Sequence, residues 1–442
     1  MSVHVAADNS VALMAANARQ AALRLAALPN DFRRKPLLAA AAAIEKQSVE
    51  ILEANAIDCA AASVLVEQGK MSRALFKRLQ TSERGVVQMA AQVREVAAQE
   101  DPLGRDLAVT ALDTDLTLTK VTCPLGVVAV IFESRPDVIP QVASLALRSG
   151  NAILLKGGSE AERTNTVLVK IWREALAGFA DVPADSINLL HTREDVNQLL
   201  AMDAEIDLII PRGSNAFVRY IMQHSRIPVL GHGEGICHVY VDRTADLKKA
   251  FEICFDSKVQ YPAACNSAET LLVHEEIAGR FLPEMIERYV AAGVELRGCA
   301  RTMVVAGDSR VVEATEEDWA TEYSDLVISI KIVSSVEEAI DHVNRWGSKH
   351  TDSIVTEDLK AATEFMDRVD AAGVYHNAST RFADGYRYGL GAEVGISTGK
   401  IHARGPVGVE GLTTYKYKLI GNGHTVASYS AGERTFKHRQ LK

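Results

Sequence analysis

Short apolar runs alternate with longer amphipathic segments from residue 126 onward. The apolar runs occupy residues 127–132, 152–155, 207–210, 239–241, 270–273 and 327–330. Strands that are apolar along their whole length are typical of parallel sheets that helices cover on both faces. The pattern therefore predicts an α/β fold built on parallel sheets.

The first hundred residues follow a helical pattern instead. They are rich in Ala, Leu, Glu and Arg. Apolar side chains recur there at spacings of three and four residues, which places them on one face of a helix. The clearest set is Val86, Met89, Ala90, Val93 and Ala97. We expect a layer of helices ahead of the first sheet.

Strict alternation of polar and apolar residues marks a third kind of segment. Between residues 106 and 122, leucines alternate with Asp and Thr, which predicts an exposed antiparallel hairpin. A second strand-like stretch, polar and aromatic, covers residues 412–420. Because an unpaired strand edge invites pairing with another chain, these segments predict a ribbon that joins subunits of a homo-oligomer.

The length of 442 residues predicts two or three domains. No Pro- or Gly-rich linker separates the two expected sheets, and we place the passage between them within residues 245–261. The expected divisions are residues 1–245, residues 246–408 and residues 409–442, with the hairpin 106–123 joining the last division in the ribbon.

Composition removes several classes of function. The chain is 48% hydrophobic and 24% charged, and no segment is apolar enough to span a bilayer, so we expect no membrane partner. A net charge of -9 without clustered Lys and Arg argues against nucleic acid. Residues 1–20 lack the features of a signal peptide, which predicts the cytoplasm.

Familiar catalytic motifs are missing from the sequence. There is no G-x-x-x-x-G-K-[ST] loop, no H-E-x-x-H pair, no G-x-S-x-G elbow and no G-x-G-x-x-G fingerprint. We therefore predict no metal site, and any dinucleotide must be held by other turns.

Two glycine-containing turns follow predicted strands and open helices, at residues 154–159 and 211–214. Free backbone amides at such turns bind phosphate, and Lys156, Ser159 and Arg212 add donors and charge. Each turn alone is equally explained as a simple connection between strand and helix. Together they indicate a dinucleotide.

Six cysteines are spread along the chain without a C-x-x-C pair, so we expect free thiols. Cys265 lies in a loop of small residues near the predicted domain junction, where a nucleophile would be accessible. Cys237 and Cys123 also lie in loops, and a packed structural thiol remains the alternative for each of the three.

Four motifs carry a resemblance to the aldehyde dehydrogenase superfamily and, within it, to the gamma-glutamyl phosphate reductases. They are Glu133-Ser134-Arg135-Pro136, Leu155-Lys156-Gly157-Gly158, Gly347-Ser348-Lys349-His350-Thr351-Asp352 and Asn377-Ala378-Ser379-Thr380-Arg381-Phe382. With the cysteine loop and Glu322, they run in order over nearly the whole chain. The resemblance implies a fold of two parallel-sheet α/β domains with a β-ribbon for oligomerisation.

The resemblance also implies roles for the divisions of the chain and for single residues. Residues 1–245 would bind NADPH or NADP, residues 246–408 would carry the nucleophile Cys265, and residues 409–442 would hold the oligomerisation strand and tail. The implied cofactor residues are Lys156, Gly157, Gly158, Ser159, Gly213, Ser214 and Glu322. The implied oxyanion and substrate residues are Ser134, Arg135, Asn266, Asn377, Ser379, Thr380 and Arg381.

Arg135 and Arg381 are the expected anion binders, because guanidinium groups grip carboxylates and phosphates bidentately. A surface or domain-bridging salt bridge is the alternative for each. NADPH is expected over NADH because Ser159 stands where NAD-using relatives carry an acid, and Glu160 is shifted by one position.

The implied reaction is NADPH-dependent reduction of L-glutamyl 5-phosphate to L-glutamate 5-semialdehyde and phosphate through a thioester, the second step of proline biosynthesis from glutamate. The resemblance implies that glutamate 5-kinase makes the substrate and contacts this chain transiently. A hydrolytic aldehyde dehydrogenase is the nearest alternative, but His232 stands where its glutamate base should be, with Glu234 displaced by two positions. A non-catalytic relative ranks lower.

Overall fold

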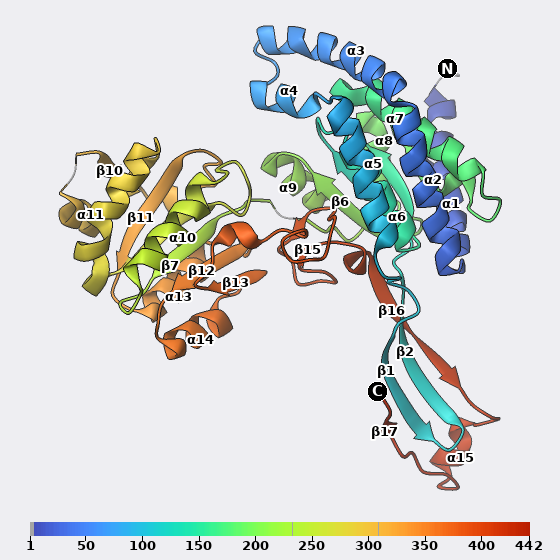
Figure 1. The fold of residues 1–442 in the computed structure, drawn as a ribbon. Coiled ribbons are helices and arrows are strands. Elements are labelled where there is room, and N and C mark those ends of the chain that lie inside the picture. The colour runs from blue at the N-terminus through green and yellow to red at the C-terminus, as the bar shows by residue number, and fades with distance from the viewer. Residues whose placement is uncertain (1–3, 232, 308) are drawn as a thin grey trace.

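Two parallel sheets organise the chain, and a narrow ribbon projects from one of them (Figure 1). The computed structural model describes residues 4–231, 233–307 and 309–442. We call the four-stranded parallel sheet with its helices the first lobe. The seven-stranded parallel sheet with its helices is the second lobe. Among the helices of these residues, none is both long and apolar enough to cross a lipid bilayer.

The first lobe contains a parallel sheet in the order β5-β4-β3-β6. Its strands are β3 (Val127–Phe132), β4 (Ala152–Lys156), β5 (Ile187–Leu189) and β6 (Leu208–Arg212). All six residues of β3 are buried, as its apolar run predicts. The helices of this lobe are α1 (His4–Leu25), α2 (Asn30–Lys46), α3 (Ser48–Glu67), α4 (Arg73–Leu79), α5 (Glu83–Ala98), α6 (Val138–Arg148), α7 (Glu162–Ala177), α8 (Arg193–Leu199) and α9 (Asn215–His224).

The second lobe contains a parallel sheet in the order β10-β9-β11-β8-β7-β12-β13. The strands are β7 (Cys237–Val241), β8 (Ala268–His274), β9 (Glu295–Gly298), β10 (Val311–Glu313), β11 (Val327–Val333), β12 (Thr351–Val355) and β13 (Gly373–His376). The helices are α10 (Leu247–Val259), α11 (Glu275–Ala291), α12 (Ala300–Ala306), α13 (Val336–Trp346) and α14 (Leu359–Arg368). The α/β class with two parallel sheets is confirmed.

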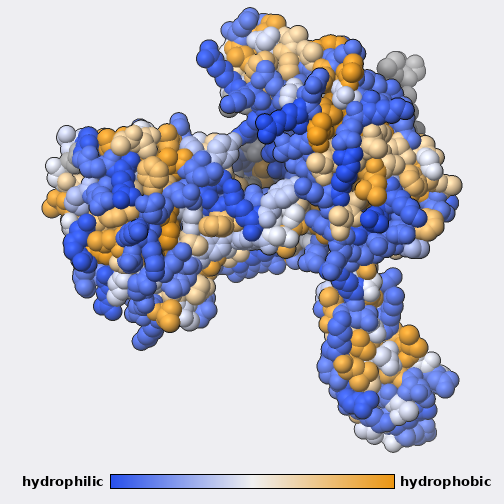
Figure 2. Space-filling model, in the orientation of Figure 1, coloured by the Kyte–Doolittle hydropathy of each residue, from blue (hydrophilic) through white to orange (hydrophobic). Residues whose placement is uncertain are grey.

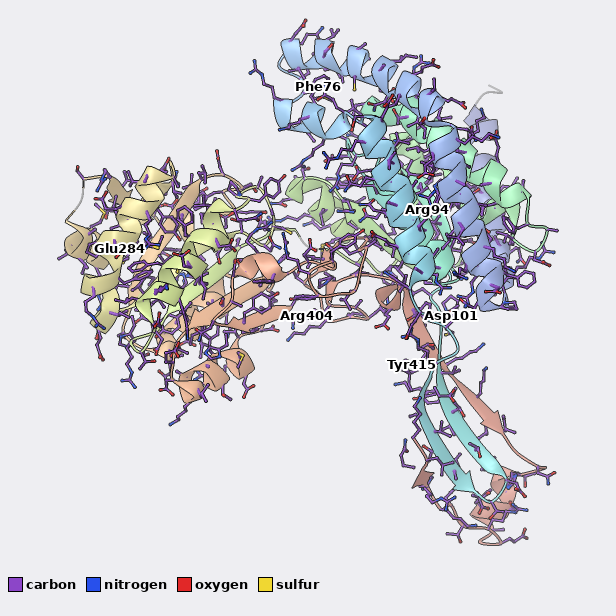
Figure 3. The ribbon with its side chains drawn as sticks, in the orientation of Figure 1. Phe76, Arg94, Asp101, Glu284, Arg404 and Tyr415 are labelled. Atoms are coloured by element: carbon purple, nitrogen blue, oxygen red, sulfur yellow. The ribbon has the colours of Figure 1, made fainter. Side chains whose placement is uncertain are left out.

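The ribbon is an antiparallel sheet in the order β16-β2-β1-β17. It consists of β1 (Asp106–Asp113), β2 (Leu116–Pro124), β16 (Thr413–Ile420) and β17 (Arg439–Gln440), with α15 (Val426–Ser430) near its tip. The predicted hairpin and the predicted stretch at 412–420 are therefore confirmed as strands, and they pair with each other. Tyr415 lies near the base of the ribbon (Figure 3), with the Nζ of Lys120 3.6 Å from its ring centre.

The placement of the passage between the two sheets at residues 245–261 is wrong. Strand β7 pairs with β8 and β12, so the chain enters the second lobe before Cys237. A short apolar run fits either sheet equally well, and only its hydrogen-bonded neighbours reveal which one it joins. The expected end of the second division at residue 408 is also displaced, because Ala392 and Val407 pack in the core of the first lobe.

The chain thus crosses between the lobes twice. The first crossing lies between α9 and β7, and the second follows β13 and includes β14 (Ile396–Ser397) and β15 (Gly405–Pro406). Arg404, labelled in Figure 3, lies on the second crossing and donates to the backbone oxygen and Oδ1 of Asp370 at 3.2 and 3.0 Å. Asp370 precedes β13, so this pair fixes the returning segment to the second lobe.

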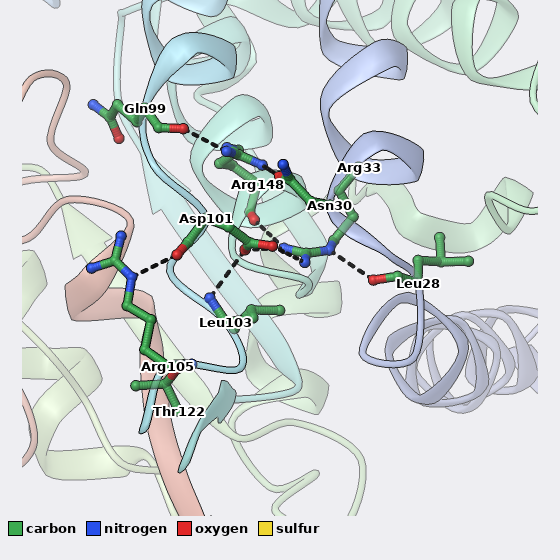
Figure 4. A network of polar contacts seen from close by, with 9 residues as sticks. All are labelled: Leu28, Asn30, Arg33, Gln99, Asp101, Leu103, Arg105, Thr122 and Arg148. Carbon is green, nitrogen blue, oxygen red and sulfur yellow. Dashed lines mark hydrogen bonds and ion pairs between the residues drawn. The ribbon is translucent and has the colours of Figure 1, made fainter. Parts of the chain in front are cut away.

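A buried polar network joins the helices of the first lobe to the start of the ribbon (Figure 4). The Arg33 guanidinium, on α2, donates to both carboxylate oxygens of Asp101 at 3.0 and 2.8 Å and to the backbone oxygen of Arg148 at 2.8 Å. Asp101 also accepts from the amide of Leu103 at 3.0 Å. Arg33 is only 4% exposed, so its charge depends on these partners.

We expect Arg33→Ala to lower the free energy of unfolding by about 3 kcal/mol, because Asp101 and the Arg148 carbonyl lose a buried donor. Urea denaturation followed by circular dichroism measures this change. Arg34→Ala is the matched control on the same helix; its side chain is exposed, and the change should stay within about 0.5 kcal/mol. Equal effects of the two substitutions would contradict the role of the network.

Candidate active site

Opposite edges of the two parallel sheets meet at the junction of the lobes. Lys156 and Arg212 are the last residues of β4 and β6, at the carboxyl edge of the first sheet. Cys265 precedes β8, and His350 precedes β12. Because β8, β7 and β12 are parallel neighbours, the residues ahead of them gather at one edge.

A cavity of about 580 Å³ lies between these edges, where Figure 2 shows the surface hollowed between the lobes. It is lined by Arg212, Gly213 and Ser214 from the first lobe and by Cys265 and Glu322 from the second. A second cavity of about 530 Å³ reaches Cys265 from another side and is lined by Tyr261, Asn266 and Arg381, among others. The thiol therefore stands where two cavities meet.

A third cavity, of about 820 Å³, covers the end of β4. Lys156, Gly158 and Ser159 line it, and it shares Phe132, Glu133 and Ser214 with the cavity at Cys265. The two glycine turns singled out in the sequence thus line two adjoining cavities that share part of their walls. An extended ligand placed there would reach from Lys156 to the thiol.

Neighbouring side chains approach two of the predicted cofactor glycines closely. A Cβ on Gly213 would lie 2.7 Å from the Glu133 carboxylate, and one on Gly157 would lie 2.0 Å from the Asn165 amide. Gly157 does not line the cavity over β4, so its role is close packing beneath the turn. Beside Gly213, the Glu133 carboxylate accepts from the amide of Ser214 at 3.1 Å.

Ser134 is not brought to the thiol. Its amide and its hydroxyl both donate to Oε1 of Glu160 at 2.6 Å, and it lines neither cavity at Cys265. Its backbone has a φ of 38°, a conformation that this pair of hydrogen bonds holds in place. The expected oxyanion role of Ser134 therefore has no geometric support.

Asn266, Asn377, Ser379 and Thr380 serve mainly the packing of the second lobe. The Asn266 side chain lines the second cavity but donates to the Ala383 carbonyl at 2.8 Å. Asn377 bonds the backbone of Thr356, while Ser379 and Thr380 bond the Ser257 hydroxyl. None of Asn377, Ser379 and Thr380 is among the described residues that line the two cavities at Cys265.

Three arginines surround the thiol. Arg381 is buried and donates through Nε to Gln260 at 2.9 Å, whereas the more exposed Arg135 is paired with Asp137 at 3.0 Å. Nη1 of Arg212 is buried and finds no hydrogen-bond partner among the described residues. Burial lowers the pKa of Arg212 to about 10, which an anion in the cavity would offset.

The Cys265 thiol contacts an imidazole. Nε2 of His350 lies 3.2 Å from Sγ of Cys265, and Nδ1 of the same ring lies 2.9 Å from Oγ1 of Thr351. On the other side, the backbone of Gly235 approaches so closely that a Cβ there would lie 2.1 Å from the Cys265 carbonyl oxygen. The nucleophile is thus fixed between two segments of the second lobe.

The electrostatic surroundings of Cys265 disfavour the thiolate. Burial and, to a smaller extent, the carboxylates of Glu322 and Glu393 raise the pKa of Cys265 to about 12, against the opposing effect of Arg381 and Arg212. Glu393 lines both cavities at the thiol and accepts from the amide of Gly385 at 2.9 Å. Burial also raises the pKa of Glu393.

His232 and Glu234 are the two residues at or near the position where a hydrolytic aldehyde dehydrogenase carries its base. His232 lies outside the described residues. Glu234 forms an ion pair with Arg219, and among the described residues it does not line either cavity at Cys265. Glu234 therefore has its own partner and is not directed at the thiol.

His350 and Glu393 were not identified as site residues from the sequence. His350 stands in one of the four motifs, but β12 was not predicted, so its nearness to Cys265 could not be deduced. Glu393 follows a glycine-rich stretch with no periodic pattern. A polar residue directly ahead of β12, which is separated from the cysteine strand β8 only by β7, is the signal that would have found His350.

Comparisons with known proteins agree with this geometry. The model of the aldehyde dehydrogenase family matches residues 1–297. Gamma-glutamyl phosphate reductase of Natronomonas pharaonis is 55% identical over 96% of both chains, and gamma-glutamyl phosphate reductase 1 of Synechocystis sp. is 52% identical over 97% of both.

A crystal structure of gamma-glutamyl phosphate reductase from Thermotoga maritima superposes with a TM-score of 0.90 at 40% identity, covering 94% of this chain and 99% of the other. Sequence and fold agree over nearly the full length. The chain belongs to the aldehyde dehydrogenase family and, within it, to the gamma-glutamyl phosphate reductases.

Proposed function

We propose that the chain reduces L-glutamyl 5-phosphate to L-glutamate 5-semialdehyde and phosphate with NADPH, the second step of proline biosynthesis from glutamate. The names of the relatives support this reaction. The observation that carries it is the position of Cys265, whose thiol lines both cavities between Arg212 and Arg381. A nucleophile with guanidinium groups on two sides suits a substrate that is anionic at both ends.

The two adjoining cavities that Lys156 and Cys265 line suit a dinucleotide bound across both. Lys156, Gly158 and Ser159 would hold its adenosine end, Gly213 and Ser214 its pyrophosphate, and Glu322 its nicotinamide ribose. When bound, NADPH supplies the hydride that reduces the thioester. The structural feature that supports the fit is that Gly213 and Ser214 line the cavity at Cys265. The Ser214 amide donates to the Glu133 carboxylate at 3.1 Å, and a bound pyrophosphate would replace that carboxylate.

Preference for a 2'-phosphate is supported by charges around the cavity over β4. Lys156 and Ser159 line this cavity together with His191 and Arg193. Glu160 also lines this cavity, and its Oε1 accepts hydrogen bonds from the amide and the hydroxyl of Ser134. The side chains around the adenosine end therefore include two cations and a hydroxyl that suit a phosphate.

The protein's own part in the chemistry begins with Cys265. Sγ attacks the acyl carbon, the carbon–oxygen bond to phosphate breaks, and a thioester forms. Arg212 and Arg381 would hold the departing phosphate and the α-carboxylate. Since the side chains of Ser134 and Asn266 already have partners, the Cys265 amide and Arg212 are the groups we assign to the carbonyl oxygen as charge develops there.

The ribbon exposes apolar and aromatic side chains along β16. Strand β16 pairs with β2 on one side, and Tyr417, Leu419 and Ile420 are 58–70% exposed along it. We infer that the ribbon joins subunits of a cytoplasmic homo-oligomer through this strand. Because an acyl phosphate hydrolyses readily in water, transient contact with glutamate 5-kinase is part of the proposal.

The decisive experiment follows NADPH oxidation by the purified chain in the presence of glutamate, ATP and a glutamate kinase. We expect kinase-dependent turnover, and Cys265→Ser should reduce it at least about 1,000-fold, because a hydroxyl is a far weaker nucleophile than a thiolate. Cys123→Ser, on the ribbon, is the matched control and should retain full turnover. Activity in the Cys265→Ser variant would refute the thioester route.

Glu322→Gln should speed alkylation of Cys265 by iodoacetamide in the free enzyme. The Glu322 carboxylate raises the pKa of the thiol, so its removal lowers that pKa and increases the thiolate fraction at any pH below it. We expect the reaction at pH 8 to become at least about twofold faster. Glu234→Gln is the control and should leave the alkylation rate unchanged, because Glu234 is already paired with Arg219. A slower alkylation in Glu322→Gln would contradict the electrostatic account.

Reverse turnover should require phosphate. Oxidation of glutamate semialdehyde with NADP leaves an acyl-enzyme, and Glu234, the glutamate nearest in sequence to the position of a hydrolytic base, is held by Arg219 and is not free to activate water. We expect NADP reduction to fall at least about tenfold in phosphate-free buffer, and Glu234→Gln should behave like the parent enzyme. Equal rates with and without phosphate, with free glutamate as the product, would identify a hydrolytic dehydrogenase.

A further inference from the structure

A chain of polar side chains leads from the buried side of Cys265 to the protein surface. It begins with His350, which contacts the thiol at 3.2 Å, and continues to Thr351, whose Oγ1 is 2.9 Å from the imidazole. His350 is 0% exposed and Thr351 1% exposed. Neither residue lines the two cavities at the thiol among the described residues, so this path is separate from them.

The path continues through two tyrosines. The Tyr375 hydroxyl contacts that of Tyr388. Burial raises the pKa of Tyr375, and the nearby Thr351 side chain opposes this rise. Thr351 pairs in register with Gly373, and the Tyr375 hydroxyl lies 3.1 Å from the place where a Gly373 Cβ would stand. The absence of a side chain at Gly373 thus gives the Tyr375 hydroxyl its position. Tyr388 is 40% exposed, so the chain ends at solvent.

We propose that His350 accepts the proton of the Cys265 thiol and that Thr351, Tyr375 and Tyr388 relay a proton between His350 and solvent. The inference rests on the proposed function, in which substrate and cofactor fill both cavities at the thiol. Water could not then carry the proton through those cavities. The path behind the thiol remains open throughout the reaction.

The relay moves one proton and no electrons. The S–H bond of Cys265 breaks as an N–H bond forms at Nε2 of His350, and the Nδ1 proton passes to Thr351. The Thr351 proton moves to Tyr375, that of Tyr375 to Tyr388, and that of Tyr388 to water. When the aldehyde is released and the thiolate is freed, the same steps run in reverse.

The charged groups around the thiol are consistent with a neighbouring acceptor. Glu322 and Glu393 face Cys265 against Arg212 and Arg381. None of these four is within the hydrogen-bonded chain. A thiol that burial holds in its protonated form needs a base in contact with it, and His350 is the imidazole that the structure places there.

Tyr375→Phe tests the relay in the full-length enzyme under the coupled assay. We expect kcat to fall about tenfold, KM for both substrates to stay unchanged, and added imidazole to restore part of kcat. Iodoacetamide alkylation of the free enzyme should keep its parental rate, because water then reaches the thiol through the empty cavities. Tyr386→Phe, two residues before Tyr388, is the matched control and should leave kcat unchanged.

His350→Asn tests the proton acceptor, because asparagine retains a polar group toward Thr351 but lacks Nε2. We expect kcat to fall about 100-fold and alkylation of Cys265 at pH 7 to slow. An unchanged kcat in either variant overturns the proposal, as does a loss in Tyr375→Phe that imidazole does not relieve. If the parent enzyme itself shows no kinase-dependent NADPH oxidation, the proposed function fails instead, so the two failures are distinguishable.

Discussion

The direction of the strands in two parallel sheets is the constraint on which the site depends. Every strand of a parallel sheet starts at the same edge, so the segments that precede β7, β8 and β12 must meet. Gly235, Cys265 and His350 come together for this reason, although they are far apart in the sequence. The opposite edge of the first sheet supplies Lys156 and Arg212 by the same rule, as open α/β sheets do when they bind ligands.

The site combines this geometry with an electrostatic balance that keeps the thiol unreactive at rest. Burial and two carboxylates favour the protonated form, while two arginines oppose them. An anionic substrate would engage those arginines, leaving Cys265 more dependent on a contacting base. The arrangement limits side reactions of a thiol that stands at the junction of two open cavities.

Much of the fold could be predicted from apolar patterns, and less of the site. The six apolar runs all became strands, because burial on both faces leaves a strong signal. Strands β5, β9, β10, β12 and β13 are short or contain polar residues, and they gave no such signal. The motif residues Lys156, Glu322 and Arg381 do line the cavities, whereas Ser134 and Asn377 have partners elsewhere, since side-chain direction depends on neighbours that are distant in sequence.

The two crossings between the lobes have a mechanical consequence. The connection from α9 to β7 and the segment after β13 are the covalent ties between otherwise separate cores. Connections between two rigid cores are where the backbone absorbs a hinge rotation. Such a rotation would change the width of the gap above Cys265. It would admit a long ligand when the gap is wide and bring the carboxyl edge of one sheet toward the thiol of the other when the gap narrows.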